Sequence, residues 1–132
     1  LILLKAASNK DFVIIVLDAT PAFFQALIVV PTVVRPQHGE TASGVLWNFN
    51  KAMPGLRASA KAWGKTKADD YIEIGCVRSV VDPCVFYHPK KDILLESHGD
   101  DAIAVGKLLD IRWFAGELTT RFDCTAQPLV GL

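Results

Sequence analysis

The chain has 132 residues, and its 14 basic residues balance its 14 acidic residues, so the net charge at pH 7 is zero. Hydrophobic residues make up 51%, which suits one compact domain, and the length is too short for two independent cores. The charge balance excludes an overall field directed at nucleic acids or membranes. The three cysteines, Cys76, Cys84 and Cys124, form no CxxC pair, which argues against a disulfide framework. We expect a single domain over residues 1–132 in a reducing compartment.

Both ends of the sequence are unusual for a natural chain. LILLKAASNK has no initiator Met and no basic segment ahead of its apolar residues, unlike a signal peptide. FDCTAQPLVGL ends on apolar residues. The longest apolar run, at 12–17, is far short of the roughly 20 residues that a membrane helix needs. We therefore expect a fragment of a longer intracellular protein, without a membrane partner.

The first half of the chain contains two strand patterns. Residues 12–17 form a β-branched apolar run that ends at Asp18, which predicts a strand covered on both faces. Residues 28–35 are also rich in β-branched side chains, but Pro31 has no backbone donor. This second strand is therefore expected at an edge or with an irregular course, followed by a loop over 36–44.

Two later stretches have helical spacing. In the first, which should end near Gly75, the apolar residues are Leu56, Ala60, Trp63, Tyr71 and Ile74. In the second, which follows Gly106, they are Leu108, Ile111, Ala115, Leu118 and Phe122. Between them, 84–88, 92–97 and 102–105 resemble strands, and HGDD joins the last two as a hairpin. This order predicts an α+β fold with helices packed on one face of a largely antiparallel sheet.

Three acidic residues are candidates for metal chemistry. Asp100 and Asp101 lie at the tip of the predicted hairpin, and adjacent carboxylates repel unless a cation or solvent compensates. Magnesium is typically held by one or two carboxylates together with substrate phosphates. Asp18 ends another strand, and a third carboxylate at one sheet edge would suit two-metal phosphoryl transfer. The alternative is a solvated turn, because Asp is common in turns.

A basic stretch over 51–67 contains no acidic residue. Its cations are Lys51, Arg57, Lys61, Lys65 and Lys67. Arg57, Lys61 and Lys65 are four residues apart, so they form a stripe along one face of the predicted helix. Such a stripe suits phosphate groups. The alternative is a solvated helix face whose charges balance the three acids at 69–73.

Other chemistry has less support. Cys84 and His88 have a CxxxH spacing, but a closed zinc site normally takes four ligands. The sequence contains no GxGxxG and no GxxxxGK[ST], and no Ser or Cys lies in a recognisable nucleophile motif. Dinucleotide binding, a P-loop and a hydrolase triad are therefore not predicted.

Five segments occur in a specific order over most of the chain. They are VLDATPAFFQA (16–26), LWNFNKAMPGLRASAKAW (46–63), SVVDPCVFYH (79–88), SHGDDAIAVG (97–106) and LTTRFDCTAQPLVG (118–131). Together they resemble the reverse transcriptase domain of copia-type retrotransposons, which shows an Asp-x-x-x-Ala-Phe block, a Gly-Leu-Arg/Lys block, Asp-Pro-Cys and then Tyr-Val-Asp-Asp. The resemblance implies a polymerase palm-like antiparallel sheet with part of the fingers.

The resemblance also implies an activity and its residues. The family adds deoxynucleotides to a primer on an RNA or DNA template with Mg²⁺ or Mn²⁺. The positions that match its catalytic, metal-binding acids are Asp18, Asp100 and Asp101. Nucleotide-binding positions would be Ala22, Phe23, Gly55 and Arg57, where Phe23 matches the aromatic residue under the incoming sugar. Contacts with nucleic acid would come from Lys51, Lys61 and Lys65.

The implied partners are template–primer, deoxynucleoside triphosphates and the rest of the polyprotein, whose remaining fingers, thumb and ribonuclease H this chain lacks. Cytoplasmic particles and the nucleus are the implied locations. His98 and Pro54 replace tyrosines of the family pattern, and Gly99 replaces a valine. We expect family-type chemistry in the parent element and little activity in the isolated chain. The alternative is a decayed or repurposed module that binds nucleic acid or packs without catalysis.

Overall fold

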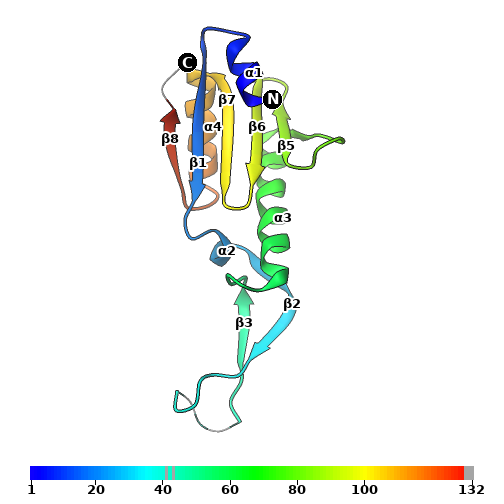
Figure 1. Cartoon of the computed structure of the whole chain (residues 1–132), viewed down its shortest axis with the longest axis vertical. Helices are drawn as coiled ribbons and strands as arrows, with labels where there is room; N and C mark the ends of the chain where they lie inside the picture. Colours follow the sequence, from blue (N-terminus) through cyan, green and yellow to red (C-terminus); the bar gives the residue numbers. More distant parts are fainter. Residues whose placement is uncertain (41, 43, 130–132) are drawn as a thin grey trace.

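The computed structural model describes residues 1–40, 42 and 44–129. In this part of the chain the helices are α1 (Ile2–Ala7), α2 (Ala22–Gln25), α3 (Arg57–Ile74) and α4 (Leu108–Thr119). The strands are β1 (Phe12–Ala19), β2 (Leu27–Val34), β3 (Trp47–Lys51), β4 (Val77–Arg78), β5 (Val85–His88), β6 (Ile93–His98), β7 (Asp101–Lys107) and β8 (Cys124–Leu129). The main sheet has the order β4-β5-β6-β7-β1-β8, and β2 pairs with β3 separately (Figure 1). Every pairing is antiparallel, so the predicted α+β class is confirmed.

The main core lies between the sheet and the helices α3 and α4. Side chains alternate along β1, and Ile15, Leu17 and Ala19 belong to this core. Large buried residues from the helices, such as Trp63 and Phe114, fill the same layer. Both long helices pack on this face of the sheet. The alternate side chains of β1, including that of Asp18, therefore point to the opposite face.

The short helix α1 covers part of that opposite face, which corrects the expectation that helices occupy one face. Ile2 is buried with Phe12, Ile14, Leu94 and Val105 at the end of the sheet away from the β6–β7 turn (Figure 1). Lys5 of α1 also pairs with Asp92. The helix has six residues and no side-chain cap at its start, so no local sequence signal predicted it.

The irregular course predicted for the second strand is confirmed. Its pairing with β3 shifts register between Leu27 and Thr32, the segment that contains Pro31. The strand belongs to the separate two-stranded sheet and not to the main one, and most of its side chains are exposed. Its partner β3 is not among the strands predicted from the sequence.

The first predicted helix is confirmed almost to the residue. Gly75 follows α3 in a left-handed conformation with φ of +113°. The amides of Gly75 and Cys76 donate to the carbonyls of Ile72 and Tyr71, which is a Schellman motif. The second predicted helix ends earlier than expected, because Phe122 lies beyond α4 although its side chain is buried. In residues 1–40, 42 and 44–129, no helix is long and apolar enough to cross a membrane.

Candidate active site

The predicted hairpin is formed by β6 and β7, with Gly99 and Asp100 as its two turn residues. His98 and Asp101 are the pair that closes it. Gly99 has φ of +52°, while Asp100 is not among the residues with positive φ. This combination is typical of a type II′ turn, which favours glycine at its first central position. The acidic residues therefore lie at the tip, as predicted.

Asp18 on β1 lies directly opposite Asp101 on β7. The amide of Ala19 donates to the carbonyl of Asp100 at 3.2 Å, so the next position, Asp18 with Asp101, is a non-hydrogen-bonded pair. In such pairs the Cβ atoms are about 4.5–5.5 Å apart. Both side chains are exposed and have the parity opposite to the α3 and α4 core. The structure thus brings two of the three predicted acids together on the open face.

Asp100 occupies the second turn position, outside the paired strands. Its carbonyl bonds to Ala19, and its side chain is exposed. Across residues 1–40, 42 and 44–129, no group of three or more His, Cys, Asp or Glu side chains is arranged to hold a metal ion. The pair formed by Asp18 and Asp101 nevertheless fits a hard cation of the magnesium type, which needs only one or two carboxylates when phosphates complete its coordination.

The open face adds two residues that sequence reasoning did not select. His98 is next to Asp101 in the register, so His98, Asp101 and Asp18 form a row across β6, β7 and β1. His98 Nε2 lies 3.2 Å from Glu96 Oε1. Glu96, His98 and Asp101 also line a hollow of about 560 Å³ that extends to Ile2 of α1. Alternation along β6 was the signal that placed Glu96 and His98 on one face.

Lys67 belongs to the basic stretch over 51–67 in the sequence, but the structure buries it beneath the turn. Its side chain is 4% exposed, and its Nζ donates to Ser97 Oγ and to the carbonyl of Gly99, both at 2.7 Å. Burial lowers the pKa of Lys67, and the charges of Asp100 and Asp101 oppose that shift. Its spacing of four from Trp63 and from Tyr71, both in the core, was the signal that could have identified it.

Ser97 connects Lys67 to a second buried polar group. Tyr71 OH is 3.4 Å from Ser97 Oγ, and burial raises the pKa of Tyr71 to about 12. Lys67 Nζ is also 5.6 Å from the centre of the Trp63 ring, within the range of a cation–π interaction. These contacts make a buried polar network directly behind the acidic hairpin.

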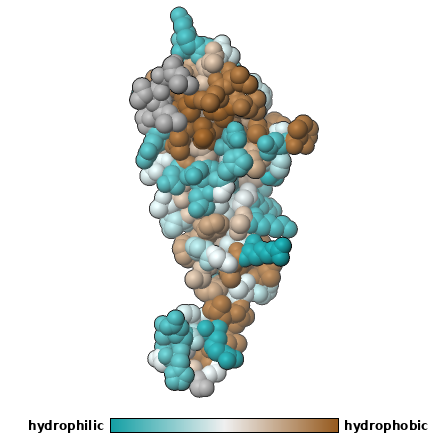
Figure 2. Space-filling model, in the orientation of Figure 1, coloured by the Kyte–Doolittle hydropathy of each residue, from teal (hydrophilic) through white to brown (hydrophobic). Residues whose placement is uncertain are grey.

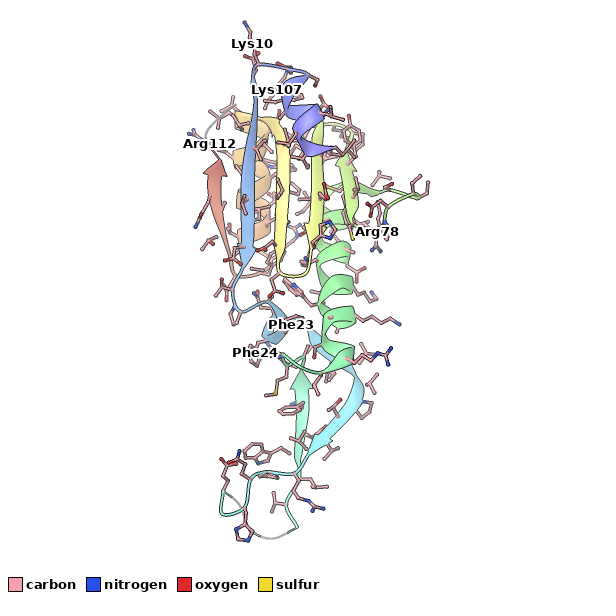
Figure 3. All side chains as sticks on the ribbon, viewed as in Figure 1. Lys10, Phe23, Phe24, Arg78, Lys107 and Arg112 are labelled. Carbon is pink, nitrogen blue, oxygen red and sulfur yellow. The ribbon has the colours of Figure 1, made fainter. Side chains whose placement is uncertain are left out.

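The predicted nucleotide-binding residues come from α2 and from the start of α3. Ala22 is buried, and Phe23 is half-buried on α2, beyond the hairpin tip (Figure 3). Phe23, Lys67 and Gly99 line one cavity of about 250 Å³. Gly55 has φ of +88° just before α3. Arg57 begins the helix and is exposed, and it is not part of that cavity's lining.

The predicted basic stripe on α3 is exposed. Lys61 and Lys65 face solvent, and Lys51 is exposed at the end of β3. Lys65 forms an ion pair with Asp69, one turn further along the helix. Part of the stripe is therefore neutralised, as the alternative interpretation predicted. The hydrophilic residues visible in Figure 2 lie mainly across the middle of the molecule and at the end opposite α1.

His88 belongs to the core, which removes the weak zinc hypothesis for Cys84 and His88. Its Nε2 is 3.2 Å from the carbonyl of Ile74, and its Nδ1 accepts a hydrogen bond from the Lys91 amide at 3.2 Å. Both ring nitrogens are therefore engaged by backbone groups, and the ring packs edge-on against Trp113. Neither nitrogen is left for a metal.

A comparison of the sequence with protein-family models finds no match, and neither does a search of curated proteins.

Proposed function

We propose that the chain carries the palm, with part of the fingers, of a copia-type RNA-directed DNA polymerase. The five ordered sequence segments support this proposal. The observation that carries it is the pairing of Asp18 with Asp101 on the open face of an antiparallel sheet whose other face is covered by α3 and α4. A template–primer needs an accessible acidic site, and this face offers one.

In this proposal the residues have distinct tasks. Asp18 and Asp101 hold a divalent cation, Mg²⁺ or Mn²⁺, with Asp100 beside them on the turn. When bound, such a cation polarises a phosphoryl oxygen and neutralises charge that develops during transfer. Phe23 contributes an apolar surface for the sugar of a deoxynucleoside triphosphate. Arg57, at the exposed start of α3, is available to phosphates.

The proposal includes the partners and locations implied by the resemblance. The template–primer and the deoxynucleoside triphosphates are substrates, and the remaining fingers, thumb and ribonuclease H complete the enzyme. The expected locations are cytoplasmic particles and the nucleus. Because a polymerase without a thumb holds template–primer poorly, substantial activity is expected only in the parent polyprotein.

Metal binding tests the site directly. Mn²⁺ or Mg²⁺ should raise the melting temperature of the chain, because a ligand at about 100 times its Kd stabilises the folded state by about 2.7 kcal/mol. Asp101→Asn should abolish the rise, because it removes one of the two facing carboxylates. Asp11→Asn is the matched control, since Asp11 is an exposed acid at the other end of β1.

A rise that persists in Asp101→Asn would place the metal elsewhere, and no rise in the unmutated chain would count against the site. Primer extension by the complete parent domain then separates an active enzyme from a decayed module. A decayed module stays inactive when fingers and thumb are restored.

The exposed stripe on α3 favours a second candidate, a nucleic-acid-binding module without catalysis. Arg57 and Lys61 are exposed on one helix face. In this case single-stranded RNA binding should weaken with salt, and the double variant Arg57→Met with Lys61→Met should reduce the logarithmic salt slope by roughly 1.4. Lys10→Met, at the far end of the molecule in Figure 3, is the control. Unchanged RNA binding in the double variant would reject the stripe.

A further inference from the structure

Lys67 is a buried cation whose side chain contacts the acidic turn directly. Its side chain is 4% exposed, and its hydrogen bonds go to a serine hydroxyl and a backbone carbonyl, both uncharged. Burying an ammonium group without a charged partner is costly. Its presence therefore needs a compensating interaction, and the negative charges of Asp100 and Asp101 are the ones that most oppose the effect of burial on the pKa of Lys67.

The hydrogen bond from Lys67 to the Gly99 carbonyl holds the first residue of the hairpin turn. Gly99 precedes Asp100, whose own carbonyl accepts the Ala19 amide, and the next residue, Asp101, pairs with Asp18. A displacement of the Gly99 peptide would therefore also move Asp100, whose carbonyl bonds to the Ala19 amide and helps to set the register between β1 and β7. The other contact, with Ser97, fixes the ammonium group against β6.

Lys67 reaches the turn from the side of the sheet opposite to the open face. It extends from α3, on the side of the sheet that also buries Ser97, whereas Asp18 and Asp101 have the opposite parity. Lys67 thus lies behind the turn and does not occupy the face on which Asp18 and Asp101 lie. An ammonium group in this place attracts the acids without covering them.

We propose that Lys67 is a positioning residue for the acidic pair, which holds the Gly99 turn from behind the sheet and balances the negative charge of Asp100 and Asp101. The proposal rests on the proposed function only in treating that pair as a cation site. Two effects follow. The turn is ordered before a cation arrives, and the resident positive charge weakens cation binding in front of it.

The first test measures the order of the turn by hydrogen exchange of the Ala19 amide, which bonds to Asp100. Lys67→Met removes the donor and the charge but keeps an apolar stem of similar length. We expect the Ala19 amide to exchange roughly tenfold faster in this variant, relative to the amides of β6, because local opening becomes easier. Lys65→Met is the matched control, since Lys65 is exposed on the same helix, and it should leave Ala19 unchanged.

An unchanged Ala19 rate, or an equal acceleration at every amide, would overturn the positioning role. Lys67→Gln keeps a hydrogen-bond donor without the charge. It should therefore protect Ala19 better than Lys67→Met, and it provides the same readout if the methionine variant fails to fold. Equal loss of protection in both variants would show that the donor is not what holds the turn.

The second test measures charge by Mn²⁺ titration, followed by broadening of the amide resonances of residues 98–102. Lys67→Gln should bind Mn²⁺ roughly fivefold more tightly, because a nearby positive charge is gone, and Lys65→Met should not. Unchanged affinity would reject the charge-balancing role. If neither protein binds Mn²⁺, the proposed cation site fails, while the Ala19 exchange rates still decide whether Lys67 holds the turn.

Discussion

Replacing Asp18 by Asn should stabilise the chain when no divalent cation is present. Asp18 and Asp101 are directly opposite each other on neighbouring strands, and like charges in this position are destabilising. If the carboxylates are separated by about 5 Å, which is typical of the Cβ atoms in such pairs, Coulomb's law gives about 0.8 kcal/mol in water and about 3 kcal/mol at an effective dielectric of about 20. Because both side chains are exposed, the value should lie near the water limit. We expect a gain of about 1 kcal/mol in the free energy of unfolding.

Urea denaturation in a chelating buffer measures this gain, and a thermal melt should show a rise of about 3 °C for a chain of this size. The gain should shrink at about 1 M salt, where the screening length falls to about 3 Å. Asp11→Asn should change neither the free energy of unfolding nor the melting temperature. A destabilised Asp18→Asn protein, or a gain that does not depend on salt, would refute the assumption that the two carboxylates repel across the strand pair.

Three further predictions concern the turn, the long helix and the core. Gly99→Ala should lower the free energy of unfolding by about 1–2 kcal/mol, because φ of +52° is unfavourable for a residue with a Cβ. Gly64→Ala, inside α3 where an added Cβ meets no atom within 4 Å, should raise the free energy of unfolding by up to about 1 kcal/mol. A urea midpoint that rises for Gly99→Ala, or falls for Gly64→Ala, would contradict the corresponding prediction. Burial raises the pKa of the Cys76 thiol from 9.0 to about 12. The contribution of the neutral thiol to the free energy of unfolding is therefore intact below about pH 9 and is lost as the pH rises toward 12. At about pH 10.5 this loss amounts to about 2 kcal/mol, and urea titrations at that pH and at about pH 8 should show a smaller loss in Cys76→Ala; equal losses would indicate that the thiol is not buried in solution.

The elements with strong local patterns could be predicted from the sequence. The apolar run at 12–17 and the HGDD turn specify β1 and the β6–β7 hairpin, because strand composition and turn chemistry act over a few residues. The helical spacing and Gly75 specify α3 and its end. In contrast, β8 pairs with β1 across more than a hundred residues of chain, and no local signal contains that information.

The candidate site could be predicted only in part, for a related reason. Residue types identified Asp18 and Asp101 as candidates, but their direct pairing depends on strand register, which the turn and the core set together. Lys67 is one of the cations of the basic stretch over 51–67, and charged residues are usually exposed. Its position on the same helix face as Trp63 and Tyr71 is visible in the sequence, but its partners, Ser97 and Gly99, come from another part of the chain.

The two-residue turn at Gly99 and Asp100 restricts how the length of this chain can vary. Side chains on β7 alternate between the buried layer, where Ala102 and Ala104 lie, and the open face, where Asp101 lies. A one-residue insertion that slipped β7 in its pairing would exchange these two sets, turning Asp101 toward the core and the alanines toward solvent. Such an insertion is accommodated only where a bulge absorbs it. A substitution at the turn therefore changes stability by a limited amount. A change in the length of the turn, in contrast, disturbs the core and the acidic pair at the same time.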